Sequence, residues 1–430
     1  MNSEEIMKKD KDYYVQGYTR VPIVLIEGNG ALLRDIEGKE YIDCFSGIAV
    51  SNVGHAHPRL VDAATKQMSK LLHTSGRFFN IPQTLLVEKI AEITPGDLKY
   101  SYLCNSGTEA VENAIKLVKK YATSRGKTGS ALIALEGSFH GRLGYAFSLT
   151  GQSKYKKGFS TYANLQGIVH APTPYPYRSK LSEDECGEEA ATALEKTIDF
   201  NTSGDVASFI MEPILGEGGI IVPPDTYFEN LTRILKERDI PFILDEVQTG
   251  FGRTGKFFAG EHWNLKPDLL TLAKGLGGGM PIGATVATSK IVECVESGDF
   301  FSTYGGNPVC SAVALENIKI LEDEKLVDNS AKIGKIFMEG LEDIQKKHPI
   351  IGDVRGKGLM IGIELVKDQL TKKPASEDAK KIVELMKNDS VIIGLGGLFG
   401  NVLRLQPPLC IDEEKAVIVL EKLEKHTSSV

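Results

Sequence analysis

Lys274 lies between an apolar run at residues 269–273 and a glycine-rich run at residues 275–279. Among apolar neighbours the charged form of a lysine loses hydration, which lowers the pKa of its amine and frees that amine to condense with an aldehyde. The glycines let a ligand approach the backbone closely. An exposed lysine beside a flexible loop is the common alternative for an isolated Lys-Gly pair. Lys274 is therefore a candidate aldehyde-binding residue that needs support from other groups.

Two other polar sites also follow strand-like runs. Asp245 ends the apolar run at residues 242–244, and ligands of open parallel sheets bind at such carboxyl ends. A buried aspartate needs a cationic partner, for which a protonated pyridine nitrogen is suitable. The segment 105–110 (NSGTEA) ends a predicted strand and opens a helix, so its free N–H groups can bind a phosphate. Helix capping is the alternative interpretation for both sites.

One cofactor accounts for the three sites together. Pyridoxal phosphate requires a phosphate cradle, an acid at its ring nitrogen and a lysine that binds its aldehyde, and it serves as an electron sink at an amino acid. The three sites follow one another in the required order, each at the carboxyl end of a predicted strand. The sequence therefore predicts a pyridoxal-phosphate enzyme in which Lys274 holds the cofactor and Asp245 tunes its ring.

The elements that must position these residues are those of an α/β protein. From about residue 100, short apolar runs alternate with longer helical ones such as 108–121, a pattern typical of a parallel sheet with crossover helices. Residues 23–44 give short β-branched runs broken at glycines, which predicts a small antiparallel meander. The predicted strands of the larger domain are 100–104, 131–135, 167–170, 206–211, 242–244, 269–273 and 282–288.

Length and composition limit the alternatives. A chain of 430 residues is too long for one compact core, so we expect a cofactor-binding domain at 61–315 and a smaller domain built from segments 1–60 and 316–430. The formal net charge of −7, without a basic segment, argues against nucleic acid as a partner. Apolar runs are too short for a secretory signal or a membrane span. The cytoplasm is the expected location.

Metal binding and disulfide formation are not predicted. The six cysteines are scattered and contain no C-x-x-C pair, which suggests neither a disulfide scaffold nor a zinc ribbon. His55 and His57 form an H-x-H pair, but no third ligand lies nearby in the sequence. We therefore expect structural histidines and no metal site.

With these motifs in place, the chain resembles the class III (subgroup II) pyridoxal-phosphate aminotransferases almost from end to end. The resemblance implies fold type I of the pyridoxal-phosphate enzymes, with a mostly parallel sheet covered by helices in the large domain and a smaller α+β domain from the terminal segments. The motifs that carry it are GIAVSNVGHAHP at 47–58, NSGTEAVENAIK at 105–116, FHGR at 139–142, EPILGEGG at 212–219, LDEVQTGFGRTGKFFA at 244–259, PDLLTLAKGLGGGMP at 267–281 and TYGGNP at 303–308.

The resemblance also implies which residues contact the cofactor. Gly107 and Thr108 would hold the phosphate. Phe139 would stack on one face of the ring and Val247 on the other, although plain core packing is the alternative for Phe139. Gln248 would bond the phenolic oxygen.

A further implied contact crosses between two copies of the chain. By the resemblance, Thr303 would reach the phosphate of the neighbouring subunit, whereas an ordinary loop hydroxyl is the alternative. A residue shared in this way implies a homodimer with shared active sites. Whether two dimers pair into a tetramer is left open.

Substrate carboxylates need a fixed guanidinium, because arginine binds them in a bidentate fork and keeps its charge. Arg404 matches the family's carboxylate-binding arginine, and Arg142 matches a second arginine that meets the substrate's other carboxylate. Glu212 matches a carboxylate gate that pairs with Arg404 when the substrate has no α-carboxylate. An unpaired arginine on a solvated loop is the alternative for Arg142.

Several reactions fit the resemblance. FHGR, GEGG and FGNV look most like 4-aminobutyrate aminotransferases, with 2-oxoglutarate as acceptor, whereas HTSGRFFNIP at 73–82 and GDVRGKGLMIGIELVKD at 352–368 look more like alanine:glyoxylate aminotransferases. Acetylornithine or ornithine transamination and amino-acid racemisation within the same family are further alternatives. A cofactor-free binding protein is disfavoured by the joint presence of Asp245, Gln248, Lys274 and Thr303. A nucleotide-binding dehydrogenase lacks its G-x-G-x-x-G motif.

Overall fold

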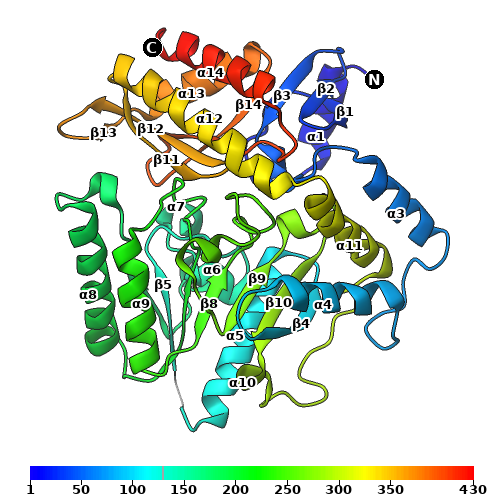
Figure 1. Ribbon diagram of the computed structural model, residues 1–430, viewed down its shortest axis with the longest axis vertical. Coiled ribbons are helices and arrows are strands. Elements are labelled where there is room, and N and C mark those ends of the chain that lie inside the picture. Colours follow the sequence, from blue (N-terminus) through cyan, green and yellow to red (C-terminus); the bar gives the residue numbers. More distant parts are fainter. Residues whose placement is uncertain (128–129) are drawn as a thin grey trace.

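The larger domain is built on a seven-stranded sheet in the order β4-β10-β9-β8-β7-β5-β6. The computed structural model describes residues 1–127 and 130–430 of the chain. Figure 1 shows this sheet and its helices below a second domain that contains both chain termini. The strands are β4 (Leu98–Cys104), β5 (Ala131–Leu135), β6 (Ile168–Ala171), β7 (Val206–Met211), β8 (Phe242–Asp245), β9 (Leu269–Leu272) and β10 (Gly283–Thr288).

One strand of this sheet runs against the others. β9, β8, β7, β5 and β6 are parallel to one another, whereas β10 is antiparallel to both β9 and β4. Only residues 273–282 join β9 to β10, and a parallel return needs a crossover of a dozen residues or more. Because β10 reverses direction on both sides, β4 runs the same way as β8 and β9. The carboxyl ends of these three strands therefore lie at one edge of the sheet.

Helices cover both faces of the sheet, as expected for strands that are apolar on both sides. Successive residues of β5 alternate, with Leu132 and Ala134 in one hydrophobic cluster and Ile133 and Leu135 in the other. The first face is covered by α5 (Gly107–Ser124), α6 (Gly144–Leu149) and α10 (Ser289–Val292). The second is covered by α4 (Ile81–Ile93), α8 (Glu183–Asn201), α9 (Asp225–Glu237) and α11 (Pro308–Asp323).

The smaller domain joins the two ends of the chain in one eight-stranded sheet, which confirms the predicted α+β domain. The N-terminal meander is antiparallel, and its last strand pairs in parallel with a C-terminal strand, with Ile42 opposite Val391. Its strands are β1 (Leu25–Asn29), β2 (Leu32–Asp35), β3 (Glu40–Cys44), β11 (Ile351–Lys357), β12 (Met360–Asp368), β13 (Lys373–Pro374), β14 (Val391–Gly396) and β15 (Val402–Leu405), and its long helices are α12 (Leu326–Lys347), α13 (Ser376–Asn388) and α14 (Glu413–Thr427). The domain bounds 1–60, 61–315 and 316–430 stay a prediction.

The remaining elements are short or peripheral. No described helix is both long enough and apolar enough to cross a membrane. The short or peripheral elements are α1 (Ser3–Tyr13), α2 (Ser46–Ala49), α3 (Pro58–Met68), α7 (Ser153–Lys156) and the 3₁₀ turns η1 (Ser160–Ala163), η2 (Pro176–Arg178), η3 (Ala259–Trp263) and η4 (Lys274–Leu276).

The contact between α12 and the β11–β12 hairpin allows a test of packing in the smaller domain. A Cβ added at Gly334 of α12 would overlap the backbone of Gly358 in the hairpin turn, and backbone cannot move aside cheaply. We expect Gly334→Ala to lower the free energy of unfolding by about 1–3 kcal/mol. Gly17→Ala is the matched control, because Gly17 has no described atom within 4 Å of the added carbon. Denaturant melts that fail to separate the two variants would contradict this packing.

Candidate active site

A cavity of about 380 Å³ opens at the edge where β4, β8 and β9 end. The segments that follow these strands form its wall, together with the loop after β5 and the end of β7. Eight of the residues singled out from the sequence line it: Gly107, Thr108, Phe139, Glu212, Asp245, Val247, Gln248 and Lys274. The sheet therefore brings together groups that lie more than 160 positions apart in the chain.

The start of α5 forms the part of the cavity that suits a phosphate. Ser106 caps this helix through a hydrogen bond from the Glu109 N–H, 3.2 Å long, and the N–H groups of the first turn have no acceptor within the helix. Gly107 is required at this position, because a Cβ there would lie 2.7 Å from a methyl carbon of Val247. The positive end of an 18-residue helix thus faces the cavity at a residue that leaves room for an anion.

Asp245 is held by three donors at the end of β8. It is buried, and its carboxylate accepts hydrogen bonds from the Val247 N–H at 3.1 Å and the Thr271 hydroxyl at 3.0 Å. His140 Nδ1 lies 2.7 Å from the other carboxylate oxygen. No local pattern in the sequence links His140 to Asp245, because 105 residues separate the two partners. The oriented, buried acid fits the pyridine nitrogen of pyridoxal phosphate.

Lys274 follows β9 in a strained backbone conformation. Its φ of +38° lies in the left-handed region, which costs a non-glycine residue about 1–3 kcal/mol and is characteristic of functional sites. Burial lowers the pKa of its amine, an effect that outweighs the opposing charges of Glu217, Glu212 and Asp245. A lysine in this state supplies a free amine more readily than one in water.

The expected pairing of Glu212 with Arg404 is wrong. Arg404, a buried residue of β15, pairs with Glu217, whose Oε1 lies 2.6 Å from the arginine Nη1. Glu212 instead accepts hydrogen bonds from the backbone N–H groups of Phe139 at 2.8 Å and Gly216 at 2.9 Å. The two glutamates lie five positions apart in one motif, and the first is turned back into its own loop.

The pKa values of the two glutamate carboxyls are shifted in opposite directions. Burial raises the pKa of Glu212 to about 7, against the opposing effect of His140. Burial works against ionisation of Glu217 as well, but Arg404 outweighs it and lowers the pKa of that carboxyl. Glu217 is therefore the carboxylate that stays charged beside the arginine.

Tyr155 connects the two arginines and had no signal in the sequence analysis. Its hydroxyl donates to Glu217 Oε2 at 3.3 Å. The Arg142 guanidinium lies 4.3 Å from the centre of the Tyr155 ring and 5.6 Å from that of Phe139. The exposed Arg142 thus stacks beside the cavity and close to the Arg404–Glu217 pair, rather than standing free on a solvated loop.

Gln248 and Thr303 differ in how the chain itself places them. Gln248 is buried and oriented by Gln406, whose amide donates to its Oε1 at 3.0 Å. Thr303 is exposed and lies outside the cavity lining formed by its own chain. His55 and His57 bind different carboxylates, those of Asp43 at 2.7 Å and Glu324 at 3.0 Å, as expected of structural histidines.

Comparison with known proteins agrees with this geometry. The profile described as Aminotransferase class-III matches residues 13–426. The chain is 39% identical to an alanine–glyoxylate aminotransferase 2 homolog of Arabidopsis thaliana, over 96% of this chain and 84% of that protein. It is 39% identical to an acetylornithine aminotransferase of Methanothermobacter thermautotrophicus, over 96% of each. A leucine/methionine racemase of Thermococcus litoralis is 37% identical over all of this chain and 96% of its own length.

Solved structures agree as well. An (S)-enantioselective omega-transaminase from Thermomicrobium roseum superposes with a TM-score of 0.94 at 32% identity, over 100% of this chain and 99% of that one. The family profile, the relatives and the fold indicate a pyridoxal-phosphate enzyme. The terminus of α5, the buried Asp245 and the strained Lys274 indicate the same. The chain therefore belongs to the class-III aminotransferases, and pyridoxal phosphate is its cofactor.

Proposed function

We propose that this aminotransferase moves an amino group from an ω-amino acid, with 4-aminobutyrate as the best candidate, to 2-oxoglutarate in a ping-pong reaction. The observation that carries the proposal is the ion pair between Arg404 and Glu217, which Tyr155 connects to the cavity-lining Phe139. An arginine that is neutralised by a neighbouring carboxylate suits a donor without an α-carboxylate. The same arginine, once released, suits a 2-oxo acid.

The groups around the cavity divide the chemistry among themselves. Bound pyridoxal phosphate supplies the electron sink for the bond that breaks at the substrate carbon. Lys274 Nζ would hold the cofactor aldehyde and would serve as the base that carries the proton of the substrate carbon. Asp245, oriented by His140 and Thr271, stabilises the proton on the ring nitrogen. Gly107 and Thr108 would anchor the phosphate, and Phe139, Val247 and Gln248, which line the same cavity, would hold the ring.

Substrate charge determines which arginine is used. The single carboxylate of an ω-amino acid lies far from its reacting amine and binds Arg142, while Glu217 neutralises Arg404. 2-Oxoglutarate has two carboxylates, so its α-carboxylate takes Arg404 and displaces Glu217. With either substrate bound, the guanidinium groups of Arg142 and Arg404 are both paired, which avoids the cost of an uncompensated charge near a buried site.

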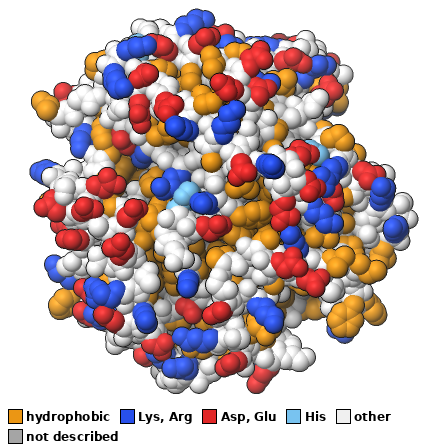
Figure 2. Space-filling view, in the orientation of Figure 1, with side chains coloured by type: hydrophobic (Ala, Val, Ile, Leu, Met, Phe, Trp, Pro, Cys, Tyr) orange, Lys and Arg blue, Asp and Glu red, His pale blue; other side chains and the backbone are white. Residues whose placement is uncertain are grey.

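A homodimer with shared active sites fits the surface around Thr303. Residues 71–81 and 301–304 are joined by contacts such as the stacking of His73 on Tyr304, with ring centres 5.1 Å apart. Figure 2 shows hydrophobic side chains exposed at this margin of the large domain. A patch of this kind suits a protein partner, and Thr303 lies within it. Its large exposed members are Leu71, Leu72, Phe78, Phe79, Ile81, Phe301 and Tyr304. The cytoplasm stays the predicted location.

The names of the relatives keep other reactions in view. Alanine:glyoxylate or acetylornithine transamination fits the similarity to proteins of those names, and racemisation fits the similarity to the leucine/methionine racemase. Arg142 favours a substrate with a second carboxylate or an ω-amino acid over alanine. A racemase would return the proton to the substrate and leave the cofactor in its aldehyde form.

A substrate panel tests the proposed reaction. 4-Aminobutyrate, β-alanine, ornithine, acetylornithine and alanine are each paired with 2-oxoglutarate, pyruvate and glyoxylate, and the initial rates are compared. We expect 4-aminobutyrate with 2-oxoglutarate to give the highest kcat/KM, and Lys274→Ala to remain folded but inactive with every pair. Arg142→Ala should weaken 2-oxoglutarate more than pyruvate. Preference for alanine and glyoxylate, with indifference to Arg142→Ala, would establish the alanine:glyoxylate alternative. An amino donor that leaves the cofactor in its aldehyde form would indicate a racemase.

The role of Asp245 predicts a large loss of kcat when Asp245 is changed and a smaller loss when its hydrogen-bond partner Thr271 is changed. Asp245→Asn should lower kcat at least a hundredfold, or about 2.8 kcal/mol in barrier, because a neutral amide no longer stabilises the protonated ring nitrogen. Thr271→Val removes one hydrogen bond from a hydroxyl to the same carboxylate and should raise the barrier by only about 1.5 kcal/mol. Steady-state kinetics with saturating cofactor measures both. Comparable kcat in Asp245→Asn and the parent would exclude Asp245 as the ring partner.

The corrected gate predicts different effects for the two glutamates. Glu217→Gln leaves Arg404 unpaired during the ω-amino half-reaction, which should slow that half-reaction roughly tenfold to a hundredfold, equivalent to about 1.4–2.8 kcal/mol. The 2-oxoglutarate half-reaction should change much less. Glu212→Gln disturbs the Phe139 backbone and should slow both half-reactions similarly. Single-turnover absorption of the cofactor measures each step. A selective effect in Glu212→Gln, with none in Glu217→Gln, would restore the original assignment.

A further inference from the structure

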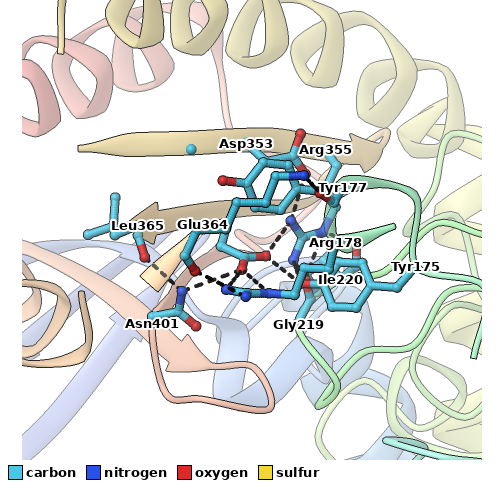
Figure 3. Close-up of polar contacts among 12 residues, drawn as sticks. Tyr175, Tyr177, Arg178, Gly219, Ile220, Asp353, Arg355, Glu364, Leu365 and Asn401 are labelled. Atoms are coloured by element: carbon cyan, nitrogen blue, oxygen red, sulfur yellow. Dashed lines mark hydrogen bonds and ion pairs between the residues drawn. The ribbon is translucent and has the colours of Figure 1, made fainter. Parts of the chain in front are cut away.

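A buried carboxylate lies at the contact between the two domains, outside the cavity. Glu364 of β12 is fully buried, and two arginines reach it, Arg178 through Nε at 2.8 Å and Arg355 through Nη1 at 2.9 Å. The Tyr175 hydroxyl donates to the same carboxylate. Figure 3 shows these side chains converging from both domains. Burial opposes ionisation of Glu364, but Arg355 and the other donors outweigh it and lower its pKa.

Arg355 and Arg178 differ in the further hydrogen bonds that their guanidinium groups make. Arg355 Nε lies 3.1 Å from both the Gly219 and Ile220 carbonyl oxygens, and its Nη2 lies 2.6 Å from the Gly219 oxygen. Arg178 uses its remaining donor on the Lys372 carbonyl at 3.1 Å, within the smaller domain. Arg355 therefore fixes the turn after β7 that carries Glu217, and Arg178 does not.

That turn needs an external hold, because its backbone is strained. Gly219 and Ile220 have φ values of +118° and +54°, and the second is unfavourable for a β-branched side chain. The turn is closed by hydrogen bonds between Leu215 and Ile221, 3.0 and 3.2 Å long. The two carbonyls of the strained residues are the ones that Arg355 binds, so its guanidinium stabilises the conformation in which Glu217 points at Arg404.

The same buried cluster also fixes the strand that carries Arg404. Asn401 donates to the Leu365 carbonyl at 2.7 Å and contacts Glu364 at 3.4 Å. In the adjoining ladder Arg404 lies opposite Gly362 of β12. One network therefore sets the position of both members of the Arg404–Glu217 pair.

We propose that Arg355 is a positioning residue that holds the Glu217 turn against Arg404 and so determines how strongly Glu217 competes with a substrate carboxylate. This inference rests on the carboxylate exchange of the proposed function. Without Arg355, the turn relaxes and Glu217 no longer neutralises Arg404 efficiently. Loss of Arg355 should then have the same consequence as loss of the Glu217 charge.

A double-mutant cycle on the holoenzyme tests this role. Arg355→Met should slow the ω-amino half-reaction by a factor similar to that of Glu217→Gln, roughly tenfold or more, while the 2-oxoglutarate half-reaction changes less than about threefold. In the Glu217→Gln background Arg355→Met should have almost no further selective effect. Arg178→Met is the matched control, because it disturbs Glu364 without touching the turn, and its effects should be unselective and additive.

A binding measurement gives a second readout that does not depend on turnover. Glutarate, an unreactive dicarboxylate, should bind about threefold or more tightly to Arg355→Met and Glu217→Gln than to the parent in calorimetric titrations, because Glu217 competes less for Arg404. Arg178→Met should bind glutarate as the parent does. If Arg355→Met fails to fold in thermal melts, Arg355→Lys is judged by the same criteria, since one ammonium cannot serve Glu364 and both carbonyls.

The outcomes distinguish failure of the Arg355 positioning role from failure of the proposed carboxylate exchange. If Glu217→Gln slows the ω-amino half-reaction selectively, but the effect of the Arg355 variant is additive or equal in both half-reactions, the positioning role is overturned and the proposed function stands. Equal damage to both half-reactions in Glu217→Gln overturns the carboxylate exchange and the positioning role together. If Arg355→Met and Glu217→Gln are non-additive, and Arg178→Met binds glutarate as the parent does, Arg355 is supported as the residue that holds the Glu217 turn.

Discussion

The common direction of β4, β8 and β9 is the constraint on which the site depends. Their carboxyl ends meet at one edge because β10 reverses direction on both of its sides. This edge receives the amino terminus of α5, the carboxylate of Asp245 and the amine of Lys274. Each group suits a different part of one pyridoxal phosphate, namely its phosphate, its ring nitrogen and its aldehyde. Residues far apart in the chain thus become a single site through strand direction alone.

Burial determines how the charges around that edge are arranged. A charge removed from water is costly unless other groups pair with it, and the acids here are tied into connected sets. Asp245 is joined to His140, and Glu217 to Arg404. Lys274 is the exception, because burial outweighs the carboxylates around it and lowers the pKa of its amine. The residue proposed to act as the base is therefore the one whose charged form is disfavoured.

Local sequence was enough to predict the sheet, the cofactor and the positions of Lys274 and Asp245 at strand ends, because an apolar run followed by a chemically distinctive residue is a short-range pattern. Lys274 and Asp245 are residues of this kind. The partner of Arg404 was assigned wrongly, since Glu212 and Glu217 share one motif and only the course of the turn after β7 separates them. His140, Tyr155 and Arg355 act through partners distant in the chain, which no local pattern reveals. The direction of β10 could have been inferred from the short link that precedes it.

The arrangement of the two domains bears on how a substrate can exchange carboxylates. Arg404 belongs to the smaller domain and Glu217 to a turn of the larger one, so displacement of Glu217 breaks a contact between domains. The contacts of Arg355 with the Gly219 and Ile220 carbonyls cross the same boundary and do not involve the substrate. They bind the backbone of the Glu217 turn rather than the Glu217 carboxylate, so rotation of that side chain alone would not break them. In the proposed exchange of substrates, rotation of the Glu217 side chain is therefore enough to release Arg404, and the backbone contacts of Arg355 do not have to break.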